Sequence, residues 1–302
     1  MIPSLRQLQY LTLLAEHGSF SRAAEAAHVS QPALSAGVQE LEKILGAAVV
    51  ERTRGNVILT AVGEEAVHRA GVILAQVEDL VEAAHAAGKP LSGRFRLGVI
   101  PTIAPFLLPR ALPSLKIRFP QLRLFLREDQ TSRLIAGLRA GTLDAALIAL
   151  PYDTSGLDIA PVARDALLAT FPLDHPGCEA TPVDLSSLNR DELILLEDGH
   201  CLRDHALAAC GLSAPGEDRT FAATSLHTLV QMVGAGLGVT LLPDMAVQAG
   251  LAETARVTVR PLMNEQAMRD IVLVWRYASA RTPEARLLAT SLKEICEAAP
   301  LA

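Results

Sequence analysis

The feature that most constrains this 302-residue chain is a long apolar pattern of helical spacing in its first third. Between Ala61 and about Ala87 the apolar residues step by four and three: Val62, Ala66, Ala70, Ile73, Val77, Leu80 and Ala84. This spacing predicts the seam of a coiled coil, on a helix that would reach roughly 40 Å. Such a helix has no core of its own, so we expect dimerisation through the seam or packing against the downstream part of the chain.

The long helix divides the chain into three regions. A chain of 302 residues is long enough for two or three domains, and its 50% apolar content suffices for a core in each. The segment 88–93, with the sequence GKPLSG, interrupts the helical pattern and indicates a hinge. We therefore expect one domain over residues 1–60, a linker helix over 61–88 and a second domain over 89–302.

Ahead of the long helix, the sequence predicts a helix-turn-helix. Leucines at helical spacing begin at Leu5, Gly18 ends that helix, and a short second helix follows up to the turn at 28–30. Ser30 caps a third helix that has Pro32 close to its start. Two short helices joined by a tight turn are typical of DNA-binding proteins, and an ordinary three-helix bundle is the alternative. The residues expected to face the major groove are Ser30, Gln31, Pro32 and Ser35. Those expected to pack inward or along the first helices are Ala33, Leu34, Val38 and Leu41.

Residues 49–60 predict a β-hairpin with a basic, turn-forming tip at 54–56. A winged helix-turn-helix uses such a tip to touch phosphate or the minor groove, so Arg52 and Arg54 are the expected phosphate contacts. Two solvated surface arginines are the alternative. Net charge does not decide the matter, because the chain carries −6 and residues 1–60 hold five basic and five acidic residues. The prediction of DNA binding therefore depends on the motif.

Strands alternate with helices after the hinge. We expect strands at 95–100, 122–128 and 145–150, separated by helices at 107–119 and 131–140, and such alternation predicts a mostly parallel sheet. Near residue 164 the chain is expected to cross to a second lobe, and it returns with a strand at 271–275. Two lobes joined by crossing strands, at about 94–163 with 268–302 and about 164–267, are the arrangement of periplasmic binding proteins.

The segment around Cys201 carries the chemistry. His200, Arg203 and His205 lie next to this cysteine in sequence, and cationic neighbours favour the nucleophilic thiolate. Cys210, nine residues on, is placed to resolve an oxidised Cys201, which is the layout of a peroxide sensor. In a continuous helix the two thiols would lie roughly 13 Å apart, whereas a disulfide needs Cα atoms within about 7 Å. Forming the bond would therefore unwind the segment.

Two other interpretations of these cysteines stay open. They could be free structural cysteines, because a buried thiol behaves as a small hydrophobe. A zinc site from Cys201, His205 and Cys210 would lack a Cys-x-x-Cys pair and a fourth ligand, so we expect no metal and no cofactor. We assign no functional role to Cys178 and Cys296.

The number of cysteines and the hydropathy of the chain indicate the cellular compartment. Four cysteines in a chain of this length do not form a disulfide scaffold, which predicts a reducing cytoplasm. No apolar stretch of about 18 residues and no leader pattern occurs, so we expect no membrane association.

Three short motifs resemble the LysR-type transcriptional regulators: residues 19–24 (SFSRAA), 30–35 (SQPALS) and Leu41-Glu42. The resemblance spans essentially the whole chain. Residues 196–204 (LEDGHCLRD), with Cys210, resemble the hydrogen-peroxide sensors within that family. The resemblance implies an α/β multidomain protein with an N-terminal winged helix-turn-helix, a long linker helix and a two-lobed periplasmic-binding-protein-like sensor domain. One departure is Gly37, which lies within the recognition helix and leaves that position without a base-reading side chain.

The resemblance also implies a function and partners. The chain would be a DNA-binding regulator and no enzyme, activated by hydrogen peroxide through a reversible Cys201–Cys210 disulfide. A cytosolic thiol reductant would reset it, and it would bind operator DNA as a homodimer or homotetramer, together with RNA polymerase. The residues implied to surround Cys201 are Thr102, Thr131, His200, Arg203, Asp204 and Arg269. Helix caps or turns are the alternative for the threonines, and pairing with Arg203 is the alternative for Asp204.

The sequence is compatible with two other functions. A LysR-type regulator could respond to a small organic effector bound between the two lobes, with the cysteines no longer decisive. A thiol peroxidase is the second alternative, but the helix-turn-helix, the hairpin and the long helix would then have no use.

Overall fold

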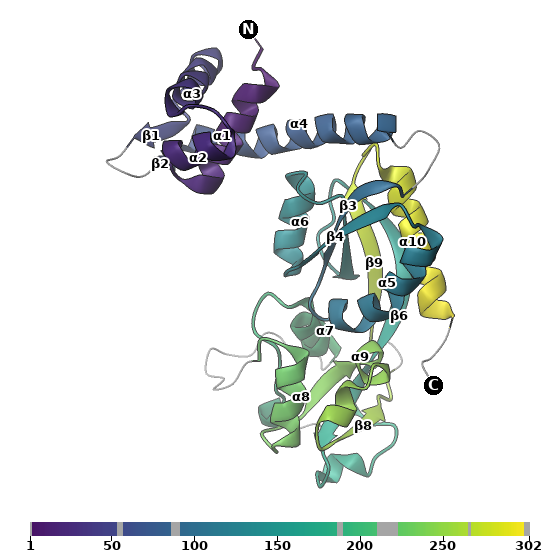
Figure 1. Cartoon of the computed structure of the whole chain (residues 1–302). Coiled ribbons are helices and arrows are strands. Elements are labelled where there is room, and N and C mark those ends of the chain that lie inside the picture. Colours follow the sequence, from purple (N-terminus) through teal and green to yellow (C-terminus); the bar gives the residue numbers. More distant parts are fainter. Residues whose placement is uncertain are drawn as a thin grey trace. The chain divides into compact units, whose positions relative to one another are not determined.

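The structure is a computed structural model that describes residues 2–52, 57–85, 91–185, 190–209, 223–264 and 267–298. The chain divides into two compact units, the first built on residues 1–85 and the second on residues 86–136 and 143–302 (Figure 1). The two units are described separately below.

Three helices form the core of the first unit: α1 (Leu5–His17), α2 (Phe20–Ala26) and α3 (Gln31–Leu45). Ser4 and Gln7 cap each other reciprocally at the start of α1, and Gly18 ends this helix in the left-handed conformation with φ 60°. The apolar stripe of α1 is buried except at Leu5, which is exposed in the first turn. The predicted helices and their turn are confirmed.

The hairpin and the long helix complete this unit. Strands β1 (Val50–Arg52) and β2 (Val57–Leu59) pair antiparallel, which confirms the predicted hairpin, while its tip at 54–56 lies outside the described residues. Helix α4 (Ala61–His85) places Ala70 in the core of the unit. Further along the predicted seam, Ile73 is 41% exposed and Leu80 is 68% exposed. The seam therefore packs in part on its own unit and in part offers apolar side chains to solvent.

In the second unit, lobe I follows the predicted alternation of strands and helices. Its elements are β3 (Gly93–Val99), α5 (Ala104–Arg118), β4 (Leu122–Glu128), α6 (Thr131–Arg139) and β5 (Ala145–Leu150). Strand β3 pairs in parallel with β4 and β5. In Figure 1, α6 lies on one side of these strands, and α5 lies on the other with α10 (Thr282–Glu297).

Two long strands, β6 (Leu157–Pro172) and β9 (Met268–Arg276), connect lobe I with lobe II. The strand order is β4-β3-β5-β9-β6-β7, with β8 also on β6. The prediction of a mostly parallel sheet is wrong, because the pairings β5–β9, β6–β9, β6–β7 and β6–β8 are all antiparallel. The physical reason is that the chain crosses once out along β6 and once back along β9, so the two connecting strands run in opposite directions.

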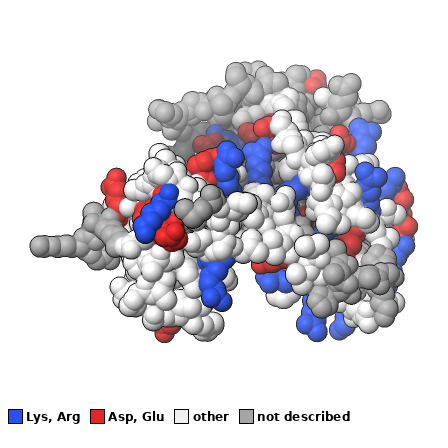
Figure 2. All heavy atoms as spheres, turned by 90° about the horizontal axis from the view of Figure 1, so that it is seen from above, with Lys and Arg blue, Asp and Glu red and all other residues white. Residues whose placement is uncertain are grey.

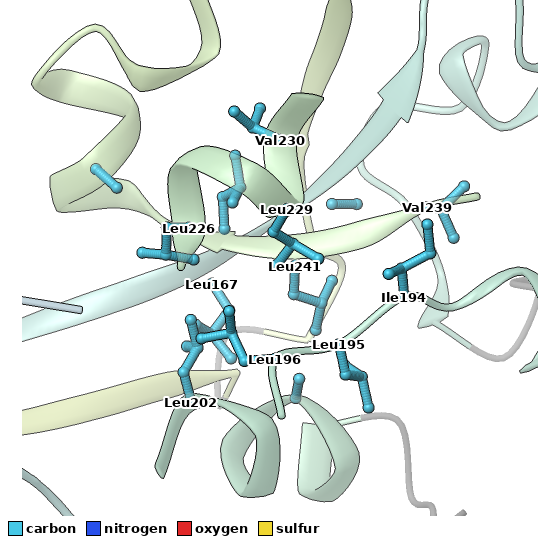
Figure 3. Packing of buried hydrophobic residues seen from close by; sticks show 14 of the residues in the cluster. Leu167, Ile194, Leu195, Leu196, Leu202, Leu226, Leu229, Val230, Val239 and Leu241 are labelled. Atoms are coloured by element: carbon cyan, nitrogen blue, oxygen red, sulfur yellow. The ribbon is translucent and has the colours of Figure 1, made fainter. Parts of the chain in front are cut away.

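Lobe II packs its helices on the far ends of these strands. It contains α7 (Cys201–Ala209), α8 (Leu226–Gly234), β7 (Thr240–Pro243), α9 (Asp244–Gln248) and β8 (Val257–Pro261). Its core joins Leu202 of α7 to Leu226 and Leu229 of α8, as Figure 3 shows. Helix α7 is therefore anchored by apolar contacts one residue after Cys201. Within the described ranges, no helix combines the length and the apolarity that crossing a membrane would require.

Candidate functional site

The start of α3 presents polar groups to solvent. Ser30 caps this helix by accepting a hydrogen bond from the Ala33 backbone at 3.4 Å, and Gln31 accepts one from the Ser21 hydroxyl at 3.1 Å. Ser30, Gln31 and Pro32 are exposed and Ser35 is half-buried. These four residues are therefore accessible to a DNA groove.

The inward face of α3 differs from the prediction at one position. Leu34, Val38 and Leu41 are fully buried, which confirms them as core residues. Ala33 is exposed, so its predicted inward packing is wrong. Ala33 immediately precedes Leu34, and adjacent residues on a helix do not share a face.

Gly37 has a packing role. A Cβ atom built on it would lie 2.7 Å from the ring of Tyr10 on α1, closer than carbon atoms pack, so glycine here allows α1 and α3 to approach each other. Arg52 ends β1, but its side chain and all of Arg54 lie outside the described residues. The face drawn in Figure 2 carries basic and acidic side chains next to one another among the described residues.

The second candidate site lies in the second unit around Cys201. Cys201 is the first residue of α7 and is 7% exposed. Thr102 follows β3, and Thr131 is the first residue of α6, directly after β4. Both threonines and Arg269 of β9 are buried. The ends of β3 and β4 thus carry polar side chains where α/β sheets place their ligands.

Arg269 is the most constrained group of this site. It is 0% exposed, and its Nε and Nη2 atoms donate to Asp165 Oδ2 at 2.9 Å and 2.7 Å. Its Nη1 donates to Thr102 Oγ1 at 2.8 Å, and Nη2 also donates to the Thr102 carbonyl at 3.0 Å. The guanidinium therefore fixes the Thr102 side chain.

Sequence reasoning missed Asp165. It lies opposite Arg269 in the β6–β9 register, is 4% exposed, and also accepts from the Met245 backbone at 2.9 Å. The available signal was an acidic residue directly before the apolar stretch 166–169 of β6, because a buried carboxylate requires a charged partner.

The electrostatics of Cys201 differ from the sequence prediction. Burial raises the pKa of the Cys201 thiol, and this outweighs the lowering by the Arg269 guanidinium, the Thr131 hydroxyl and the Leu202 backbone. The neighbours in sequence do not supply the predicted positive charge. Burial lowers the pKa of His200, and Arg203 pairs with Asp198 at 3.2 Å. The cation that acts on the thiol is instead Arg269, from a distant strand.

The remaining residues that the resemblance assigns to the site do not all lie beside the Cys201 thiol. His200 is buried at 7% exposure, beside the thiol in sequence, with Nε2 3.9 Å from Glu197 Oε1. Asp204 is exposed and so does not line the buried cluster, although its charge raises the pKa of Cys201. The carboxylate partner of Arg203 is Asp198 rather than Asp204. Cys210 lies outside the described residues.

The sequence predicts His205 as a cationic neighbour of Cys201, but not as a buried hydrogen-bonding group of the site. Its Nε2 lies 2.6 Å from the Leu150 carbonyl oxygen. Its Nδ1 and the Thr131 Oγ1 are the two buried side-chain polar atoms that have no hydrogen-bond partner among the described residues. The available signal was its spacing of four residues from Cys201, which places both on one face of a helix. Among the described residues, no group of three His, Cys, Asp or Glu side chains could hold a metal ion.

A helix-turn-helix unit and a two-lobed α/β unit together define a transcriptional regulator. Residues 5–64 match the family model for the bacterial regulatory helix-turn-helix protein of the lysR family, and residues 88–297 match the LysR substrate binding domain. The chain therefore belongs to the LysR family of transcriptional regulators, which bind DNA and are not enzymes. The expected fold class is confirmed.

Individual relatives refine this assignment. The chain is 40% identical over 295 residues to the HTH-type transcriptional regulator EstR of Acinetobacter baylyi, covering 97% of each chain. It is 39% identical over 290 residues to the DNA-binding transcriptional dual regulator OxyR of Escherichia coli, covering 96% of this chain and 95% of OxyR. Full-length OxyR of Pseudomonas aeruginosa, with a cysteine-to-aspartate substitution, superposes with a TM-score of 0.81 at 36% identity, covering 97% of this chain and 95% of that one.

Hydrogen-peroxide-bound OxyR of Corynebacterium glutamicum, with a cysteine-to-serine substitution, superposes with a TM-score of 0.67 at 33% identity, covering 99% of this chain and 94% of that one. Along nearly its whole length the chain thus closely resembles OxyR.

Proposed function

We propose that this regulator responds to hydrogen peroxide through a reversible Cys201–Cys210 disulfide. The observation that carries the proposal is a buried thiol at the start of α7, accompanied by buried Arg269 and by two buried polar atoms, Thr131 Oγ1 and His205 Nδ1, for which the described part of the chain offers no hydrogen-bond partner. A small polar molecule would satisfy those atoms. The likeness to OxyR, and to a relative named hydrogen peroxide-inducible genes activator, supports the same chemistry.

The proposed cycle of oxidation and reduction has three steps. The Cys201 sulfur attacks one peroxide oxygen, the O–O bond breaks, and the products are a sulfenic acid and water. The Cys210 thiol then attacks the oxidised sulfur, which releases a second water and leaves the disulfide. A cytosolic dithiol reductant resets the pair by thiol–disulfide exchange and becomes oxidised itself. In the first step, Arg269, Thr102, Thr131 and His200 would orient the peroxide and stabilise the leaving oxygen.

The signal would pass from α7 to DNA by a change of fold. In the reduced protein α7 is helical up to Ala209, and a disulfide with Cys210 requires Cα atoms within about 7 Å, so the helix must unwind. We propose that this alters the packing between sensor domains (89–302), and that linker helices (61–88) transmit the change to DNA-binding domains (1–60). The assembly is a homodimer or homotetramer on operator DNA, in contact with RNA polymerase.

The likeness to EstR, whose name mentions no peroxide, favours a second candidate. This candidate is a regulator that responds to a small organic effector between the lobes. Contacts between the lobes already occupy part of this region: Phe106 of α5 stacks on His227 of α8 with ring centroids 5.9 Å apart, and His205 contacts Leu150. These contacts favour the peroxide-responsive candidate.

The test is mass spectrometry of tryptic peptides from the full-length reduced protein, before and after an equimolar amount of hydrogen peroxide. Thiols that remain free after this treatment are alkylated before the digestion. Trypsin cleaves after Arg203, so the disulfide joins two separate peptides. We expect this cross-linked pair in the wild type and in a Cys178→Ser control, and its loss in Cys201→Ser.

Two outcomes would contradict the proposal. Both thiols could stay free, or oxidation could spread equally over Cys178 and Cys296. In either case the effector-responsive candidate would stand. Transcription assays separate the two candidates independently, because Cys201→Ser abolishes induction only if the thiol is the sensor.

A further inference from the structure

The orientation of the His205 ring is fixed by the end of β5. Its Nε2 lies 2.6 Å from the Leu150 carbonyl oxygen, and a carbonyl oxygen can only accept a hydrogen bond. Nε2 therefore carries the proton. In a neutral imidazole the other nitrogen is then a lone-pair acceptor, so Nδ1 is a base in its free form.

This acceptor is buried. His205 is 7% exposed, and its Nδ1 has no hydrogen-bond partner among the described residues. A buried polar atom without a partner costs free energy, and such atoms in native proteins call for an explanation. A ligand that can donate a hydrogen bond would provide one.

His205 lies on the same face of α7 as Cys201, and among the described residues no hydrogen bond joins its imidazole to the Cys201 thiol. It lies four residues after Cys201 on α7, and side chains of a helix lean toward its N-terminus. The imidazole therefore covers the turn that begins with Cys201. The Arg269 guanidinium acts electrostatically on both the thiol and the imidazole, which places both near one cation.

We propose that His205 is the proton acceptor and donor for peroxide reduction at Cys201. This inference deepens the proposed function and rests on it. Nδ1 takes the thiol proton while the sulfur bonds to the nearer peroxide oxygen and the O–O bond breaks. The same proton then passes to the farther oxygen, which leaves as water. The sulfur is oxidised by two electrons to the sulfenic acid, the peroxide is reduced, and the imidazole is again neutral.

The surroundings suit a proton carrier that does not stay charged. Burial, together with Arg269, keeps the pKa of His205 below its ordinary value, while the Leu150 carbonyl, Asp204 and Asp270 oppose this effect. The imidazole is therefore neutral near neutral pH and can accept a proton. Once protonated it is a stronger acid than an exposed imidazolium, because the buried cation next to Arg269 is unfavourable, so it returns the proton readily.

The pH dependence of oxidation separates this role from a structural one. With His205 as the base, the rate of sulfenic acid formation should be nearly constant between the lowered pKa of His205 and the raised pKa of Cys201. Without His205, the reaction depends on thiolate that is already present. The thiolate fraction rises about tenfold per pH unit below the pKa of the thiol, so the rate of oxidation rises by the same factor over this range. Near neutral pH we expect a variant without the His205 imidazole to form the sulfenic acid about 100-fold more slowly, which is typical of a lost general base.

The experiment measures sulfenic acid formation in the full-length protein by rapid mixing with hydrogen peroxide and trapping with dimedone. Cys210→Ser serves as the background, so that the sulfenic acid persists. His205→Leu removes the base. His205→Gln keeps a donor for the Leu150 carbonyl but cannot carry the proton, so it serves as the test even if the leucine variant unfolds. The matched control is His175→Leu, which removes a partly buried imidazole bonded to Glu192 at 3.1 Å elsewhere in lobe II.

Either His205 variant with a wild-type rate and a flat pH profile would overturn the inference, as would an equal loss in His175→Leu. A different result would show that the proposed function itself is wrong. The parent protein with His205 intact would then form no sulfenic acid at Cys201 at equimolar peroxide.

Discussion

At the scale of single residues, the buried Arg269–Asp165 pair supplies the nearby cation that acts on the pKa of the Cys201 thiol. Arg269 lowers the pKa of Cys201 against the larger effect of burial. Removing Arg269 alone would leave Asp165 as an unpaired buried carboxylate, which is strongly destabilising. Replacing both charges keeps the site neutral and hydrogen-bonded, and so isolates the electrostatic effect on the thiol.

We therefore predict that the double variant Arg269→Gln with Asp165→Asn raises the pKa of Cys201 further, because a nearby cation favours the thiolate. The measurement is the ultraviolet absorbance of the thiolate as a function of pH. Arg276→Met, on the same strand, is the control and should leave the titration unchanged. A double variant that titrates like the wild type would show that Arg269 does not act on the thiol.

His200 and His205 make stability depend on pH. Burial lowers the pKa of both, so on acidification the unfolded chain binds protons first, from about pH 6.5 downward. The free energy of unfolding is thus unaffected above that pH and falls as the pH drops toward the folded-state values. We expect the midpoint of thermal unfolding to fall over this range, and to fall less in His205→Gln. Equal slopes for wild type and variant would contradict the assignment.

At the scale of elements, the contact between α1 and α3 depends on Gly37. A larger residue gains about 1 kcal/mol of helix propensity, but its Cβ would lie 2.7 Å from the Tyr10 ring, and overpacking costs about 1–3 kcal/mol. We predict that Gly37→Leu lowers the thermal stability of the DNA-binding unit. Adding Tyr10→Ala makes room and should restore part of the loss. If the single variant is as stable as the wild type, α1 and α3 do not need this close approach.

Helix α7 connects the thiol to the core of lobe II through Leu202, which is 2% exposed. Truncating a buried leucine costs about 2–5 kcal/mol, and on the proposed mechanism only the reduced, helical form of α7 has this contact. We predict that Leu202→Ala shifts the protein toward the disulfide in a glutathione redox buffer, as read by thiol alkylation. Leu97→Ala in β3 of lobe I, another fully buried leucine, is the control, because it weakens both forms. No difference between the two variants would argue against unwinding.

At the scale of the whole molecule, α4 leaves Ile73 and Leu80 exposed in the single chain. We predict that Leu80→Lys weakens self-association, measured by sedimentation, and with it binding to palindromic DNA, since two half-sites need two linked recognition helices. Met263→Lys, at another exposed apolar residue (60% exposed), should leave both unchanged. A variant that sediments like the wild type would place the dimer interface elsewhere.

The sequence by itself determined the local structure. Leu8, Leu11 and Leu14 marked the buried face of α1, and Ser30 and Gly18 marked helix ends, because periodicity and caps act between residues a few positions apart. The strands β4 and β5 and the motifs of the LysR family were predictable for the same reason. The spacing of Cys201 and Cys210 likewise predicted a candidate sensor.

Only the tertiary structure decided the electrostatics and the direction of the connecting strands. His200, Arg203 and His205 were the cations expected from sequence, yet burial lowers the pKa of both histidines and Asp198 pairs with Arg203. The cation that acts on Cys201 comes from β9, and its partner Asp165 comes from β6. Burial and Coulomb interactions depend on distance in space, so residues far apart in the chain set the chemistry of a thiol whose position the sequence had already predicted.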